Sequence, residues 1–162
     1  MARHLPVIQN QDPEDAAAEE RSPRGWVVVG AMLGFTLWLP LLMIAQWVSA
    51  KWTLAVSSDG APSYDTLLLI QLGPVFLTLM IATGGAGALV GRFGGRARAL
   101  HAALSGLAMA VGVGALAVLS GSFPSLLVAL LGTLILALVA TSSGYVGGRL
   151  GVRRRPSIKP KA

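Results

Sequence analysis

The chain has 162 residues and a formal net charge of +6 at pH 7; 54% of its residues are hydrophobic and only 12% are charged. Soluble domains carry roughly 25% charged residues, so this composition argues against an ordinary soluble globular protein. The absence of cysteine excludes a disulfide framework, a thiolate metal site and a cysteine nucleophile.

Residues 1–25 precede the first apolar segment and are polar, acidic and proline-containing. Such a composition cannot bury a core, which predicts a flexible cytoplasmic tail. The acidic side chains leave two interpretations open, a tail that is only solvated and a tail that binds a partner protein.

Four apolar runs without Asp, Glu, Lys or Arg follow, at about 26–48, 66–90, 99–119 and 124–147. Each run exceeds the roughly 20 residues that a helix needs to cross a bilayer. In lipid, a helix satisfies its own backbone groups, and runs this uniform do not alternate as barrel strands do. The predicted fold class is all-α. We expect a polytopic membrane protein whose four transmembrane helices form two helical hairpins within residues 26–148.

The links between these runs differ in length. Residues 49–65 are predicted to form the only sizeable external loop, and Ser63 or Asp65 is expected to cap the second span. Within that span, Gly73 and Pro74 predict a kink, which either lines a cavity or only shapes packing.

Lys and Arg gather before the first span, between spans two and three, and in the tail 149–162. Cytoplasmic loops carry an excess of these residues, so both termini are predicted to be cytoplasmic, at a bacterial inner (plasma) membrane. Anionic lipid headgroups or an acidic partner are the expected contacts. No aromatic residues interleave the tail, and a nucleic-acid partner is therefore not predicted. The candidate contact residues are Arg92, Arg96, Arg98, Arg149, Arg153, Arg154 and Arg155.

Every span carries small residues at a spacing of four, which places them on one helix face. Small residues let helix backbones approach closely in lipid, where little hydrophobic force drives helices together. The pattern predicts a tightly packed bundle, a homo-oligomer or contact with other membrane subunits. The candidate helix-packing residues are Gly30, Gly34, Gly87, Gly91, Gly95, Gly106, Ala110, Gly114, Ala140, Gly144 and Gly148.

The glycines at 85, 87 and 91 also spell G-x-G-x-x-x-G, which raises the alternative of a dinucleotide site. Such a site needs a preceding strand and an acidic residue about 20 positions later. Here the preceding run belongs to a predicted span, and no Asp or Glu occurs after Asp65. No cofactor is predicted, and paired carboxylates for acid–base work are missing from the membrane region.

A shift of 57 residues places 87–98 on 144–155, with the shared pattern G-x-x-x-G-R-[FL]-G-x-R-x-R. One interpretation is a duplication that gives two parallel helical hairpins related by an axis along the membrane normal. The other is convergence, because a Gly-rich helix end followed by Arg suits any cytoplasmic boundary.

A few polar side chains remain within the spans. His101 either caps the third span and meets headgroups, or it pairs with Ser105 or binds haem. Gln46 and Gln71 form a possible polar intramembrane site, where interhelical hydrogen bonding and substrate binding are the alternatives.

The leading functional hypothesis is a non-enzymatic integral membrane subunit that packs through its small-residue faces and aids assembly or stability of a larger inner-membrane complex or homo-oligomer. The alternatives are a small oligomeric channel or facilitator built from two-plus-two helix repeats, and a membrane-embedded lipid-modifying enzyme.

Overall fold

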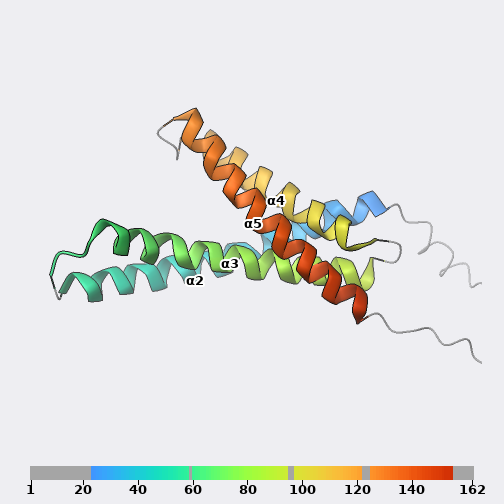
Figure 1. Cartoon of the computed structure of the whole chain (residues 1–162), viewed down its shortest axis with the longest axis horizontal. Helices are drawn as coiled ribbons and strands as arrows, with labels where there is room; N and C mark the ends of the chain where they lie inside the picture. Colours follow the sequence, from blue (N-terminus) through green and yellow to red (C-terminus); the bar gives the residue numbers. More distant parts are fainter. Residues whose placement is uncertain (1–22, 59, 95–96, 122–124, 155–162) are drawn as a thin grey trace, which may run out of the picture.

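The computed structural model of the chain describes residues 23–58, 60–94, 97–121 and 125–154 (Figure 1). Over these ranges all regular structure is helical. The helices are α2 (Pro23–Ser58), α3 (Tyr64–Phe93), α4 (Ala99–Leu119) and α5 (Leu126–Arg153). Each of the four is long and apolar enough to cross a membrane. The described residues confirm the predicted all-α class with four helices of membrane-spanning length.

The described helices follow the predicted spans with one large difference. Helix α4 has the predicted bounds, whereas residue 124, where the fourth span was expected to begin, lies outside the described residues. The loop expected over residues 49–65 is wrong, because α2 continues to Ser58. Residues 50–58 contain neither Gly nor Pro, and polar side chains end an apolar run without ending a helix.

The turn after α2 contains residues that disfavour a continued helix. Gly60 has φ +135°, a conformation that glycine adopts without strain, and Pro62 follows it. Of the two expected caps, Ser63 is the N-cap of α3, and its hydroxyl accepts a hydrogen bond from the Thr66 N–H at 3.3 Å. Helix α3 then runs on through Pro74.

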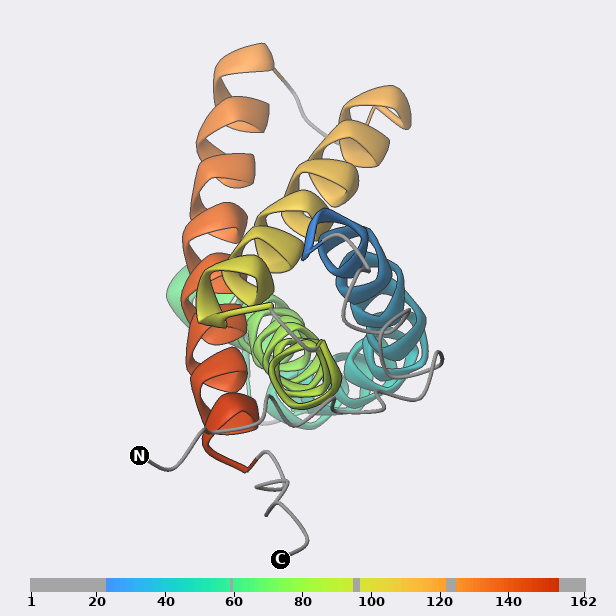
Figure 2. The same cartoon turned by 90° about the vertical axis from the view of Figure 1, so that its right-hand side faces the viewer.

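The helices lie in two antiparallel pairs, α2 beside α3 and α4 beside α5 (Figure 1). The pairs cross near the end of the molecule where α2 and α4 begin and where α3 and α5 end. Away from that end they spread apart, and the α2–α3 pair reaches farther than the α4–α5 pair. Figure 2 looks along the molecule from the crossing end, where the four helices gather. The most extensive helix contacts are those of α5 with α3 and with α4.

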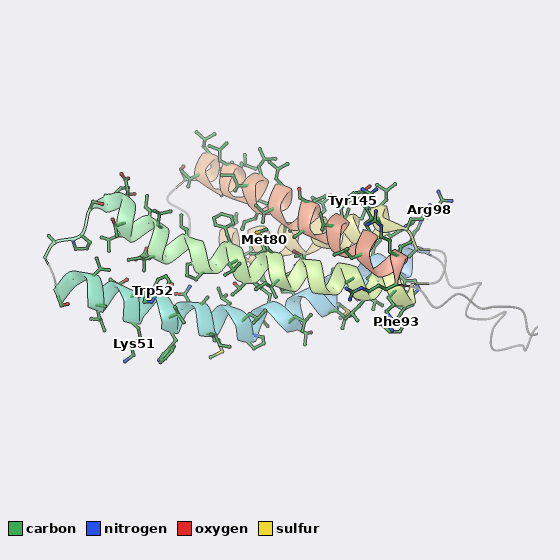
Figure 3. All side chains as sticks on the ribbon, turned by 60° about the horizontal axis from the view of Figure 1, so that its bottom comes forward. Lys51, Trp52, Met80, Phe93, Arg98 and Tyr145 are labelled. Atoms are coloured by element: carbon green, nitrogen blue, oxygen red, sulfur yellow. The ribbon has the colours of Figure 1, made fainter. Side chains whose placement is uncertain are left out.

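The core lies where the pairs cross, and all four helices contribute to it. Its buried members are Trp38, Leu79, Ala82, Met109, Ala110 and Ala140. Half of these are alanines, which let the helices approach closely. A second small cluster of Val90, Ala97 and Ala102 lies nearer the end where α3 leads into α4. All four helices expose large apolar side chains along their length, which suits a lipid surrounding (Figure 3).

Candidate functional site

The glycines of α3 contact the backbone of α5 directly. A Cβ atom at Gly87 would overlap the carbonyl group of Gly144, and one at Gly91 would overlap that of Gly148. These contact pairs are also the pairs that the 57-residue shift superimposes. Helix α3 therefore approaches α5 so closely here that no side chain fits between them.

Two glycines of α5 outside the predicted helix-packing set also contact the backbone of α3. A Cβ at Gly147 would overlap the carbonyl of Gly84, and one at Gly151 would overlap that of Ala88. Beside them, the hydroxyl groups of α3 and α5 hydrogen-bond each other through Thr83 and Ser143. The four-residue spacing of Gly147 and Gly151 was a signal that could have found them.

The remaining small residues also face helices of the same chain. In α2, Gly30 faces Val90 and Ser105, and Gly34 faces Met109. In α4, Gly106 faces the Ala140 carbonyl group and Gly114 faces Thr133, while α5 turns Gly144 and Gly148 toward Ala102. Ala110 and Ala140 are fully buried. Gly95 lies outside the described residues. Each described residue of the predicted helix-packing set therefore packs against another helix of the same chain.

The two glutamines that the sequence singled out line one groove between α2 and α3, of about 730 Å³. Gln46 and Gln71 are its amides, and they are the only Asn or Gln residues after Gln11. Ser49 and Thr53 add hydroxyl groups to the lining. The apolar remainder is Ala50, Leu54, Leu72 and Val75. The structure therefore brings the predicted polar pair together and surrounds it with uncharged side chains.

A hydrogen bond at the wall of this groove ties α2 to α3. The buried Ser49 hydroxyl donates to the Ile70 carbonyl at 2.8 Å. In an uninterrupted helix the N–H four residues later would serve that carbonyl, but position 74 is proline, which has no N–H. Ser49 thus supplies the donor that Pro74 removes. The signal for this role was the proline four residues after Ile70, but the serine itself could not be identified without the helix pairing.

We expect Ser49→Ala to lower the free energy of unfolding by about 1 kcal/mol, because it leaves the Ile70 carbonyl without its donor. Reversible unfolding in mixed micelles measures the change. The loss should shrink in a Pro74→Ala background, since the new N–H can serve the carbonyl. The exposed Ser57→Ala is the matched control and should have little effect. A full loss that persists with Pro74→Ala would contradict this role of Ser49.

The predicted arginines lie at the crossing end of the molecule. Arg92, Arg98, Arg149, Arg153 and Arg154 are exposed there, whereas Arg96 and Arg155 lie outside the described residues. Arg92 and Arg153 are in the last turns of α3 and α5, where a cation favours the helix dipole. The Arg92 guanidinium also lies 5.4 Å from the centre of the Phe93 ring. Among the described residues, the only carboxylate is Asp65, near the opposite end.

Among the described residues, His101 and Ser105 hydrogen-bond to other groups rather than to each other. The Nδ1 atom of His101 accepts a hydrogen bond from the Arg98 N–H at 3.1 Å, which makes it a cap of α4. The buried Ser105 hydroxyl donates to the Ala102 carbonyl at 2.7 Å. Within the described ranges, no three His, Cys, Asp or Glu side chains lie together as a metal site requires.

A second groove, of about 740 Å³, lies between α3 and α5. Its lining is almost wholly apolar, with Leu77, Met80 and Ile81 on one side and Leu138, Val146 and Leu150 on the other. Acyl chains can cover such a surface, and the polar side chains in its lining are Ser142 and Ser143.

Comparisons of the chain with protein-family models, curated proteins and solved structures find no match. The case for a function therefore comes from the residues and their arrangement.

Proposed function

We propose that the chain is a non-enzymatic integral membrane subunit of a bacterial inner membrane that aids the assembly or stability of a larger complex or homo-oligomer. Its four apolar helices support membrane insertion. The clustered arginines at the crossing end support a cytoplasmic location for that end, facing anionic headgroups, and hence for both termini. The opposite end then faces outward.

The observation that carries the proposal is the length of the α2–α3 pair. From Trp26 to Ser58, α2 is about 48 Å long at roughly 1.5 Å per residue. A hydrocarbon core is about 30 Å thick, and even at a tilt of about 40° α2 would cover about 37 Å of depth. The tip of this pair therefore projects beyond the hydrocarbon core, whereas α4, about 32 Å long, closely matches the thickness of the core.

The projecting tip carries large apolar side chains. Trp52, Leu54 and Tyr64 are 57%, 69% and 74% exposed, and Figure 3 shows Trp52 on the outer part of α2. Trp and Tyr side chains are also typical of the headgroup interface, whereas Leu54 has no polar group that favours it. Exposed apolar surface outside the hydrocarbon core supports a protein contact site. The described small-residue faces already pack against helices of the same chain. We therefore propose that this tip is the surface that contacts other subunits.

A tagged Ser57→Cys variant tests both the orientation and the function, and the absence of native cysteine makes its labelling unambiguous. We expect a membrane-impermeant maleimide to label intact cells at position 57, and Val152→Cys to be labelled only after lysis. Purification of the same protein in mild detergent should then yield a stoichiometric complex. A protein that elutes only as a monomer without a partner would refute the subunit function.

A further inference from the structure

The groove between α2 and α3 holds two amides that lack partners in the described part of the chain. Gln46 and Gln71 are exposed, and neither hydrogen-bonds to another described residue. No charged residue lines the groove. Lys51, the nearest basic residue along α2, instead has its Nζ 5.9 Å from the centre of the Trp47 ring. The groove therefore offers hydrogen-bond donors and acceptors without a counter-charge for a phosphate group.

The two amides lie at matching heights above the arginine-rich end. Gln46 comes 20 residues after Trp26, and Gln71 comes 21 residues before Arg92. At roughly 1.5 Å per residue, both lie about 30 Å along their helices from that end, which for helices near the membrane normal corresponds to the outer edge of the hydrocarbon core. Hydrogen bonds between protein groups compete with less water there than on a surface in bulk solvent.

A carboxamide is self-complementary, because it carries an NH₂ donor and a carbonyl acceptor. A two-fold axis along the membrane normal leaves every group at its own height. It therefore lets Gln46 of one copy meet Gln71 of a second copy, and the reverse, as a symmetric interface requires. Leu54 lines the same groove and is 69% exposed, so the same contact would cover it.

We propose that this groove is the docking site for a second copy of the chain, with Gln46 and Gln71 as the paired polar contacts. The inference rests on the proposed function and names the partner and the surface. A partner with matching apolar and amide groups fits an uncharged, partly apolar groove better than a phospholipid headgroup does.

Single cysteines test the docking site in native membranes without background. Ala50 lies in the groove, whereas Ile44 is 58% exposed on the opposite face of α2, about 9 Å nearer the crossing end. On mild oxidation, we expect Ala50→Cys to give disulfide-linked dimers in at least fivefold higher yield than Ile44→Cys. Adding Gln46→Leu and Gln71→Leu to Ala50→Cys should lower the yield at least threefold. Circular dichroism of the purified variants checks that they remain folded.

Equal yields at positions 44 and 50, or a yield unaffected by both leucines, would overturn the docking site. So would a monomer that retains a lipid at this groove by native mass spectrometry. If Ala50→Cys does not cross-link while the Ser57→Cys protein still purifies with partners, only the groove inference fails. If neither dimers nor partners are found, the proposed function fails with it.

Discussion

Gly87→Ala is expected to lower the free energy of unfolding by about 2 kcal/mol. The added methyl group would overlap the carbonyl group of Gly144, which belongs to a helix backbone and cannot rotate away. Helices α3 and α5 must therefore separate, and overpacking of this kind costs about 1–3 kcal/mol. The separation should also loosen the contact between Gly91 and Gly148. Steric-trap or micelle unfolding of the purified protein measures the change.

Gly85→Ala is the matched control, two residues away on α3. The nearest atom to its new methyl group would be the Leu37 Cδ1 at 3.9 Å, an ordinary contact. Alanine favours a helix over glycine by up to about 1 kcal/mol, so this variant should be neutral or slightly more stable. If both variants destabilise the protein equally, the close approach of α3 and α5 is not what Gly87 provides.

Leu79→Ala should destabilise the protein by about 2 kcal/mol or more. Leu79 is buried in the core beside Trp38 and Met109, where the four helices cross. Removing a buried leucine side chain leaves a cavity, and in soluble proteins the cost is about 2–5 kcal/mol. In lipid the lower part of that range applies, because the removed atoms gain little from leaving water and the loss is chiefly of packing.

Leu77→Ala provides the comparison on the same helix. Leu77 is 58% exposed and lines the apolar groove, so the substitution replaces contacts with lipid rather than contacts in the core. We expect a loss below about 0.5 kcal/mol. A cost for Leu77→Ala similar to that for Leu79→Ala would mean that the helices pack around a different centre.

Some features of the site were readable from particular residues. The polar residues before an apolar run narrowed the cap of α3 to Ser63 or Asp65, and the spacing of four at Gly87 and Gly91 indicated a close helix approach. The path of α2 beyond Val48 was not readable from hydropathy. A helix ends where its backbone is interrupted, here at Gly60, and not where the apolar run ends. That difference replaces most of the expected loop with the last turns of α2.

The sequence by itself determined the class of protein and the positions of its apolar helices. Runs without charge longer than about 20 residues leave a helix as the arrangement that satisfies the backbone in lipid. It also showed which helix faces carry small residues. Those properties are local, because each depends on residues within a single helix.

Only the tertiary structure decided which helix each small face meets and what the polar residues do. Gly87 faces α5 of its own chain, and Ser49 serves a carbonyl 21 residues away. Gln46 and Gln71 share one groove because α2 and α3 pair in a particular register. Helix pairing and register depend on contacts between distant segments, and a one-helix pattern fits several such pairings equally well. The physical reason is that the favoured pairing depends on close packing in a core to which all four helices contribute.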